Sequence, residues 1–427
     1  MLKKVLITTQ VFPPEVHPSS VMVRELAEHL ARHGMEVTVA AGYPHHPYGR
    51  LYPGFRKKWL KIENRNGYGV VRGWHLINPS PAMIIRALVM ASQCAGFLWG
   101  ALNSQRPDLV ISYGPPLIGP LTSSLIARAT GARLINVIYD IYPDILLEMG
   151  KLQNPILIQA ARKLERLIYR ASDRVVVLSE GFRRTMIQEK GLDPAKVAVI
   201  PVWLDSRDIV PGARDNPWRR KMGIGPEKFV VLYAGTIGLV SGAEVVLEAA
   251  RLLEAYPDIL FLMVGAGQAK DHLAAEARKR GLQNLRFLPF QPRERLSEVQ
   301  ATAEVSLVTL APRRGKTSVP SKVMGYMAAA RPVIASVDEE CDTAELIRRA
   351  RCGLVAPPAQ GEALAEAVLY YYRHPGAREL EGRNGRRFFL KHFEKEVVLE
   401  HFLDLVDAAA GGGDDQTWLY NRMGTSP

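Results

Sequence analysis

Short apolar segments alternate with helical segments along almost the whole chain, and this alternation constrains the fold more than any other feature. The apolar runs at 4–10, 36–41 and 109–114 have the length and composition of buried strands. Amphipathic segments near 19–33 and 117–130 follow two of these runs, and a glycine closes each segment. Continuous apolar strands joined by helices are typical of a parallel sheet covered on both faces. The sequence therefore predicts an α/β, doubly wound fold.

The same pattern starts again after a polar segment at 204–229, which is rich in glycine, proline and charge and reads as a linker. A chain of 427 residues also exceeds the size at which a single core stops growing. We therefore expect two Rossmann-like domains that face each other across a cleft, with ligands beyond the carboxyl ends of the strands. The predicted ranges are 1–205 for the first domain, 206–390 for the second, 391–410 for a further helix and 411–427 for a disordered tail.

The net charge of +12 favours anionic partners such as nucleic acid, acidic lipid or phosphorylated substrates. The basic residues are dispersed and no nucleic-acid-binding motif occurs, so we expect no nucleic-acid partner. Cys94, Cys341 and Cys352 are too few and too scattered for a disulfide framework. They predict a reducing compartment, the cytoplasm. We expect no signal peptide, because the chain runs from Met1 straight into a strand-like segment.

The longest apolar run, 87–102, is shorter than the roughly 20 residues of a membrane-spanning helix and contains Ser92 and Gln93. We expect a buried or surface-lying helix there. A basic and aromatic cluster at 56–61 precedes it, and basic, aromatic and apolar surface together suits an anionic membrane face. The alternative is a core helix beside solvated charges.

The segment 315–336, "GKTSVPSKVMGYMAAARPVIAS", places polar residues before a small-residue helix and an apolar strand. Ser318 and Ser321 can cap the first turn of that helix. Lys316 and Lys322 add two ammonium charges to the positive end of the helix dipole, which suits a diphosphate. The alternative is a capped surface helix with solvated lysines.

Two loops of the first half carry further polar candidates. Asp140 directly follows an apolar strand and could bind an acceptor hydroxyl or act as a base, or only cap the next turn. The loop at 10–20 leads into a helix whose free N–H groups could hold an anion. Its alternative is a rigid turn capped by Ser19 or Ser20, with a structural His17. We assign acceptor binding to Glu15, Ser19 and Asp140.

Glycines follow two strands of the second half. Gly235 and Gly238 lie in "YAGTIG" and can let backbone approach a ligand or a neighbouring helix. Gly265 and Gly267 form half of a dinucleotide-binding fingerprint, but the third glycine is absent. A tight turn is the alternative for this pair.

Six motifs occur in order: "PPE", "YAGTIG", "VGAGQAK", "RFLPFQPRERL", "VPSKVMGYMAAARPVIAS" and "CGLVAPP". With these motifs the chain resembles the retaining glycosyltransferases of the GT-B fold over about residues 3 to 405. It is most similar to family 4, in the branch of bacterial cell-surface polysaccharide synthesis. The resemblance implies that the second domain binds a nucleotide-diphosphate sugar, usually a UDP-sugar. It also implies that the first domain binds the acceptor, that no metal or other cofactor is needed, and that the helix at 391–410 packs back on the first domain.

The resemblance also implies roles for single residues. The nucleotide base would lie near Phe290 and Gln291, the diphosphate near Ser321 and Lys322, and Asp140 would face the reacting sugar. We therefore assign catalysis to Asp140 and Lys322. The donor-binding set is Gly235, Gly238, Gly265, Gly267, Phe290, Gln291, Lys316, Thr317, Ser318, Ser321 and Lys322.

The chain departs from the pattern of these relatives in three places. Thr317 and Gly325 stand where relatives commonly have two glutamates, and the glycine would leave room beside the ribose. Residues 16–20 replace a Gly-Gly pair in the first loop. The arginine and lysine that relatives often carry after "YAG" are missing, so Lys316 and Lys322 are the candidates to supply that charge.

Together these features predict a cytoplasmic, metal-independent, hexosyltransferase-type glycosyltransferase that acts at the inner face of the cell membrane. Its donor would be a UDP-sugar and its acceptor a lipid-linked glycan in polysaccharide synthesis. Two alternatives remain: a non-catalytic nucleotide-sugar-binding partner, and a UDP-sugar 2-epimerase. The epimerase would need carboxylates and histidines in the loops. We interpret the loops as poor in histidine, which argues against the epimerase.

Overall fold

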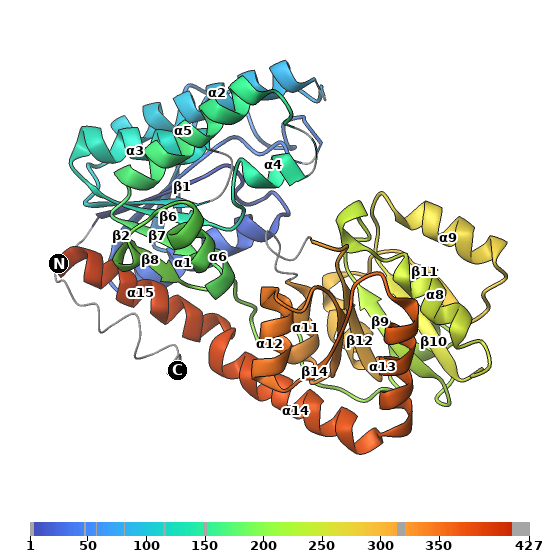
Figure 1. Cartoon of the computed structure of the whole chain (residues 1–427). Helices are drawn as coiled ribbons and strands as arrows, with labels where there is room; N and C mark the ends of the chain where they lie inside the picture. Colours follow the sequence, from blue (N-terminus) through green and yellow to red (C-terminus); the bar gives the residue numbers. More distant parts are fainter. Residues whose placement is uncertain are drawn as a thin grey trace. The chain divides into compact units, whose positions relative to one another are not determined.

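The computed structural model describes residues 4–46, 48–56, 58–80, 82–113, 117–148, 150, 152–313 and 321–411 (Figure 1). The chain divides into two compact units, of which unit 1 comprises Met1–Pro201 with Leu399–Pro427 and unit 2 comprises Val202–Val398. A strand bridge between Leu204 and Glu394 joins the two ends of unit 2. Because of this pairing the unit begins before residue 206 and ends after residue 390. The predicted disordered tail at 411–427 lies outside the described residues, apart from its first residue.

Unit 1 contains one eight-stranded sheet in the order β3-β4-β2-β1-β5-β6-β7-β8. All neighbouring strands are parallel except the β3–β4 hairpin, so the expected parallel sheet is confirmed. Val5, Leu6 and Ile7 of β1 are all buried, as a sheet covered on both faces requires. The strands are β1 (Lys4–Thr9), β2 (Glu36–Ala41), β3 (Leu60–Arg65), β4 (Tyr68–Gly73), β5 (Leu109–Tyr113), β6 (Arg133–Ile138), β7 (Arg174–Val177) and β8 (Val197–Val199).

The β3–β4 hairpin was not predicted. In β3, polar residues interrupt the apolar ones, so this strand contains no continuous apolar run. Asn66 and Gly67 form its two-residue turn with positive φ angles of 38° and 86°. Asn-Gly is the preferred pair for such a turn, because both central residues must have positive φ. The Asn66-Gly67 pair was therefore the sequence signal from which this hairpin could have been predicted.

The helices α1 (Pro18–Arg32), α2 (Met83–Leu102) and α3 (Ile118–Thr130) of unit 1 lie close to the predicted positions. Unit 1 also contains α4 (Asp144–Glu148), α5 (Pro155–Ala171) and α6 (Glu180–Arg184). The prediction that Ser19 or Ser20 caps α1 is wrong: His17 is the N-cap, and its Nδ1 accepts a hydrogen bond from the backbone N–H of Ser19 at 3.2 Å. An imidazole acceptor can thus replace the hydroxyl that usually binds this free N–H group.

Unit 2 contains a six-stranded sheet, entirely parallel, in the order β11-β10-β9-β12-β13-β14. Its strands are β9 (Phe229–Ala234), β10 (Ile259–Val264), β11 (Leu285–Leu288), β12 (Val305–Thr309), β13 (Val333–Ser336) and β14 (Gly353–Ala356). Its helices are α7 (Pro217–Lys221), α8 (Val245–Leu252), α9 (Lys270–Lys279), α10 (Leu296–Ala301), α11 (Lys322–Ala328), α12 (Asp342–Ala350), α13 (Gly361–Arg373) and α14 (Pro375–His392). A further helix, α15 (Lys395–Gly411), begins in unit 2, and its residues from Leu399 on belong to unit 1.

The strand order of unit 2, counted along the chain, is 3-2-1-4-5-6, which is the order of the Rossmann fold. Unit 1 has the same order from β4 to β7. In both sheets the order reverses between two central strands, β1 and β5 in unit 1 and β9 and β12 in unit 2. Ligands of such folds bind outside the carboxyl ends of these strands. The topology therefore directs attention to the loops after β1, β9 and β12 and to the neighbouring loop after β6.

In unit 2 the loops after β9 and β10 run side by side. The N–H of Gly235 donates to the carbonyl oxygen of Val264 at 2.9 Å, and the N–H of Ile237 donates to that of Ala266 at 2.9 Å. A Cβ atom added at Gly265, where φ is +158°, would lie only 1.9 Å from the carbonyl oxygen of Gly235. Gly265 is thus required by the close approach of two backbones, which is the tight-turn alternative for this glycine.

Replacing Gly265 by alanine should destabilise unit 2 by more than about 3 kcal/mol, because the new Cβ would collide with a carbonyl oxygen at an unfavourable φ. Gly238→Ala is the matched control. Gly238 has a φ of −100°, and the nearest atom to its added Cβ lies at 3.9 Å. The control should leave the melting temperature nearly unchanged. Equal melting temperatures for the two variants would contradict this account of the loops.

Candidate functional site

Lys322 is the charged residue at the point where the strand order of unit 2 reverses. It begins α11, which follows β12 along the chain, and its ammonium nitrogen lies 3.7 Å from the centroid of the Tyr233 ring in β9. An added Cβ at Gly235 would lie 3.4 Å from its Cε and 3.6 Å from its Nζ. The end of the side chain is therefore held directly beside the first residue after β9.

The environment of this ammonium group is poor in water and in negative charge. Burial lowers the pKa of Lys322 to about 7. Among the described residues, no carboxylate lies within ion-pair distance of Lys322, and its ammonium group contacts the face of the Tyr233 ring. A cation over an aromatic face is stabilised by about 0.5–2 kcal/mol, which offsets only part of the desolvation. An anion at this position would restore the ordinary pKa of the lysine.

Tyr326 positions α11 relative to the strands. Its hydroxyl accepts a hydrogen bond from the backbone N–H of Ala234 at 2.9 Å and lies 3.2 Å from the carbonyl oxygen of Leu307. Ala234 ends β9 and Leu307 lies in β12, so one buried side chain joins α11 to both central strands. Sequence reasoning missed this residue, because a tyrosine inside an apolar helix reads as core.

Gly325 does not leave an open space, and the expectation of room beside a ribose is not met at its Cα. The residue is buried, and an added Cβ would lie 3.3 Å from Cδ1 of Ile209 and 3.6 Å from Nε2 of Gln300. Two side chains of unit 2 thus lie in close contact with this position.

The remaining residues of this segment are less informative. Lys316, Thr317 and Ser318 lie outside the described residues. Ser321 is exposed at the N-cap position of α11, and its side chain makes no capping hydrogen bond, so the prediction that it caps the turn is wrong. The backbone there is already helical, with φ −59° and ψ −19°, whereas a capping side chain needs an extended backbone.

The predicted base-binding residues lie just after β11. Phe290 is exposed at 57%, so its ring is available to a ligand. Gln291 accepts a hydrogen bond from Nε1 of Trp218 at 2.9 Å and donates to the carbonyl oxygen of Pro289 at 2.9 Å. Its side chain therefore holds this loop, and beside it a bound base could meet the Phe290 ring and the backbone.

Asp140 in unit 1 follows β6 and lies at the carboxyl edge of the sheet. It is half-buried, and burial raises the pKa of its carboxyl group. Within the described part of the chain, Asp140 has no hydrogen bond or ion pair. Asp144 differs from it, because its carboxylate binds Nζ of Lys190 at 2.5 Å, and Lys190 also contacts Glu165 at 3.1 Å. Asp144 is therefore already paired inside unit 1.

Glu15 holds the loops of unit 1 together rather than presenting its carboxylate to solvent. The residue is 3% exposed, and its oxygens accept hydrogen bonds from the backbone N–H groups of Phe12, His45 and His46 at 3.0, 2.9 and 2.8 Å. These bonds tie the loop after β1 to the loop after β2. Ser19 lies in the first turn of α1, partly buried.

Several histidines lie around Glu15 in these loops. The expectation that the loops are poor in histidine is therefore wrong here. The rings of His17 and His46 meet edge to face at 5.4 Å, and Nδ1 of His45 lies 3.9 Å from the Glu15 carboxylate. Burial and then the neighbouring His46 lower the pKa of His17. The pair His45-His46, soon after the second strand, was the signal that could have revealed this cluster.

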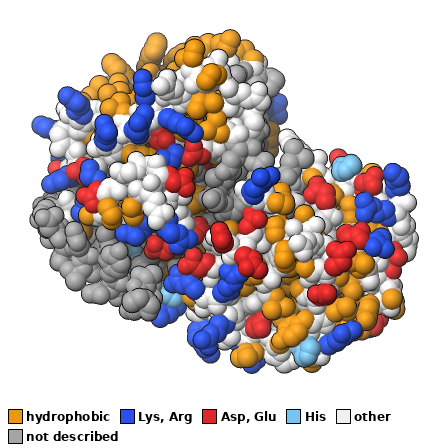
Figure 2. Space-filling model, in the orientation of Figure 1, with side chains coloured by type: hydrophobic (Ala, Val, Ile, Leu, Met, Phe, Trp, Pro, Cys, Tyr) orange, Lys and Arg blue, Asp and Glu red, His pale blue; other side chains and the backbone are white. Residues whose placement is uncertain are grey.

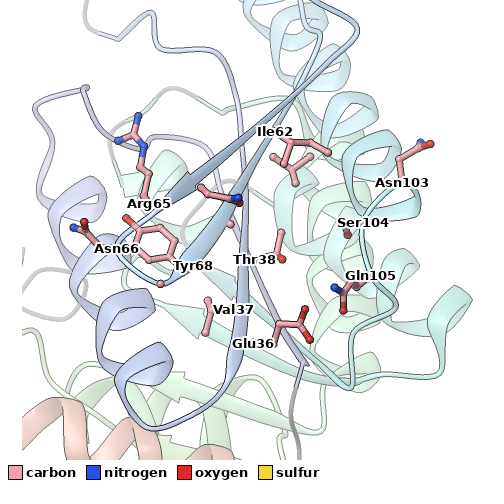
Figure 3. Close-up of a pocket in the computed structure, with 14 residues that line it drawn as sticks. Glu36, Val37, Thr38, Ile62, Arg65, Asn66, Tyr68, Asn103, Ser104 and Gln105 are labelled. Carbon is pink, nitrogen blue, oxygen red and sulfur yellow. The ribbon is translucent and has the colours of Figure 1, made fainter.

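A cavity of about 650 Å³ lies elsewhere in unit 1, at the amino ends of β2 and β4. Figure 3 shows Arg65, Asn66 and Tyr68 on one side of it and Asn103 and Gln105 on the other. Among its lining residues only Glu36 and Arg65 are charged. Its position at the opposite edge of the sheet from Asp140 and its lack of clustered ionisable groups argue against it as the catalytic site.

Two family models match the chain. Residues 19–203 match the Glycosyl transferase 4-like domain, and residues 215–388 match Glycosyl transferases group 1. A curated relative, the putative colanic acid biosynthesis glycosyl transferase WcaI of Escherichia coli K12, is 27% identical over 413 residues, covering 94% of this chain and 99% of its own length. The probable glycosyltransferase WbjE of Pseudomonas aeruginosa is 27% identical over 267 residues, covering 62% of this chain and 66% of its own length.

Solved structures share the architecture at low identity. Sucrose-phosphate synthase from Thermosynechococcus elongatus superposes with a TM-score of 0.73 at 16% identity, covering 96% of this chain and all of the other. HepE of Anabaena in complex with UDP superposes with a TM-score of 0.70 at 14% identity, covering 95% of this chain and all of the other. The two family matches together span most of the chain, so this protein belongs to the glycosyltransferases that join a 4-like domain to a group 1 domain, and it has the GT-B fold.

Proposed function

We propose that this glycosyltransferase moves a sugar from a UDP-sugar to a lipid-linked acceptor during synthesis of a bacterial cell-surface polysaccharide. The reaction retains the anomeric configuration and takes place at the inner face of the cell membrane. The name of the relative WcaI refers to colanic acid biosynthesis, and HepE is described in complex with UDP and with UDP-glucose. These names support the class of donor and product.

The observation that carries the proposal is the Lys322 ammonium group beside Gly235, at the switch point of unit 2. A diphosphate there would supply the negative charge that the described residues around the lysine do not. As the sugar leaves, charge develops on the diphosphate, and a cation already in position stabilises that charge without reorganisation. Lys322 can supply this positive charge, so the proposal needs no metal in the transfer step. Lys316, Thr317, Ser318, Ser321 and Phe290 remain proposed donor contacts.

In the proposed reaction the bond from the anomeric carbon to the diphosphate oxygen breaks, and a bond to the acceptor oxygen forms on the same face. The acceptor proton passes to the departing diphosphate oxygen. Asp140 accepts a hydrogen bond from a second hydroxyl of the acceptor and thereby orients the attacking one, with Ser19 as a further proposed acceptor contact. A half-buried carboxylate suits this role, because its surroundings leave it available to a hydroxyl donor.

Exposed apolar and basic residues support the membrane part of the proposal. One helix of the described chain, Ile84–Leu102 within α2, is long and apolar enough to cross a membrane. Its face with Cys94, Phe97 and Ala101 is buried in unit 1, which favours a helix that lies on a surface. The opposite face exposes Ile84 and Leu88.

The neighbouring helices extend this surface. Leu125 of α3 is exposed, α3 contacts both α2 and α5, and α5 exposes Leu157 and Leu167. The exposed charged residues of α5 are all basic: Arg162, Lys163, Arg166 and Arg170. Figure 2 shows hydrophobic side chains over α2, with lysine and arginine side chains beside them. Such a surface is attracted to anionic lipid.

Lys322→Met should weaken UDP binding at least tenfold, because the cation that faces the diphosphate is removed. In the wild type, affinity should fall above about pH 7, towards tenfold per pH unit, since the unliganded lysine loses its proton there. In the Lys322→Met variant, UDP affinity should not show this fall above pH 7. Isothermal titration calorimetry from pH 6 to 9 measures both effects. Lys279→Met, on an exposed lysine of α9, is the control, and equal affinities for the two variants would contradict the donor site.

Asp140→Asn should lower the transfer rate about a hundredfold and leave UDP affinity unchanged. Because burial raises the pKa of Asp140, the wild-type rate should fall on the acidic side at a higher pH than an exposed aspartate would cause. Initial rates with UDP-sugars and a lipid-linked acceptor measure this. Asp144→Asn should lower the melting temperature instead, because it breaks the Lys190 pair. If the wild type binds UDP but neither transfers nor hydrolyses any UDP-sugar, a non-catalytic binding partner is the better interpretation.

The double variant Ile84→Glu, Leu88→Glu should bind at least tenfold less to vesicles containing phosphatidylglycerol, because two exposed apolar contacts become charged. Vesicle flotation measures this loss, and UDP affinity should not change. Leu380→Glu, at an exposed leucine of α14 in unit 2, is the control. Unchanged flotation of the double variant would refute docking through α2.

A further inference from the structure

His29, His33 and Glu400 form a cluster in unit 1 that the proposed reaction does not use. His29 lies in the last turn of α1, His33 follows as the C-cap of this helix, and Glu400 lies in α15. One nitrogen from each imidazole and one carboxylate oxygen all lie within 4.8 Å of one another. Because α1 ends where β2 is about to begin, the cluster lies at the opposite edge of the sheet from Asp140.

The distances within the cluster are close to those of a zinc site. Oε1 of Glu400 lies 3.4 Å from Nε2 of His29 and 3.8 Å from Nε2 of His33. Zinc–ligand bonds of about 2.0–2.1 Å in a tetrahedron place neighbouring ligand atoms about 3.4 Å apart. A small rotation of the exposed Glu400 side chain can bring its oxygen closer to this spacing from both imidazoles. The spacing of the histidines, four residues apart on one helix face, is that of helical zinc-binding pairs.

The protonation of His33 also suits a metal ligand. Its Nδ1 lies 2.9 Å from the backbone carbonyl oxygen of His29, to which it can only donate. In the neutral ring Nε2 then carries a lone pair, and this is the nitrogen that lies nearer to Glu400. A histidine that binds metal commonly donates its other N–H to a backbone carbonyl in this way, which fixes the tautomer and the ring orientation.

We infer that His29, His33 and Glu400 bind one divalent transition-metal ion of the zinc class, with water at the fourth position. Two imidazoles and one carboxylate favour zinc over the hard cations magnesium and calcium, which prefer oxygen ligands. His29 is buried, whereas the side chains of His33 and Glu400 are 38% and 52% exposed, so an ion can enter from solvent.

The ion would fasten α15 to α1 inside unit 1. In α15, Phe402, Leu405 and Val406 are already buried, so the metal adds a polar link to an existing apolar contact. Without a metal, the same residues form a contact between histidine and carboxylate at the exposed end of α1. The site is structural and does not depend on the proposed transfer reaction.

The test uses the full-length protein, stripped with a chelator and then freed of it, and titrated with zinc chloride by calorimetry. The wild type should bind one zinc ion per chain and gain roughly 5 °C in melting temperature at a hundredfold excess over Kd. His33→Ala and Glu400→Gln should each weaken zinc binding at least tenfold. Both side chains are partly exposed, so neither substitution should unfold the protein. Magnesium chloride should give no shift.

Two matched controls keep the result specific. His272→Ala removes an exposed histidine of α9 in unit 2, and Asp407→Asn removes an exposed carboxylate of α15. Both should bind zinc as the wild type does. The inference is overturned if the wild type binds no zinc, or if His33→Ala binds it as tightly as the wild type, which would place any zinc elsewhere, for example at His17 and His46.

Discussion

In each sheet the helical crossovers change direction between two central strands, and this reversal decides where chemistry can occur. Right-handed crossovers place the helices that follow the two strands on opposite faces of the sheet, so the loops above these strands diverge. In unit 2 the strands are β9 and β12. The backbone groups at their carboxyl ends are therefore not covered by one common helix, and a side chain such as Lys322 can enter between them.

The surroundings of Lys322 show how unit 2 keeps a cation in this place. The face of Tyr233 receives the ammonium group, Gly235 allows it to approach the backbone, and Tyr326 anchors α11 to both strands. Each contact needs a particular residue type, an aromatic ring, a missing Cβ and a buried hydroxyl. The result is a lysine whose charged form is disfavoured by burial, which lowers its pKa. A strongly lowered pKa of this kind is common at functional sites.

The parallel strands and most main helices could be predicted because buried parallel strands are continuous apolar runs and amphipathic helices have a clear period. The β3–β4 hairpin could not be predicted in the same way, since the partly exposed β3 contains no continuous apolar run. The caps were also misread, because His17 and Ser321 differ from the usual pattern only through their backbone angles and neighbours. In the candidate site, Asp140 was selected because it directly follows a strand and Lys322 because it begins a helix, whereas Tyr326 resembled a core residue.

The sequence by itself determined the two-domain α/β architecture and its glycosyltransferase family, and it offered Asp140 after a strand and Lys322 at a helix start as candidates. These properties depend on local periodicity and on motifs that are contiguous in the chain. Only the tertiary structure decided what each candidate contacts. Glu15 accepts hydrogen bonds from three backbone N–H groups, and Ile209 and Gln300 contact the position of Gly325. Glu400 lies beside His29 and His33. The reason is physical, because such contacts join residues tens to hundreds of positions apart, and their distances are set by how helices pack on the sheet.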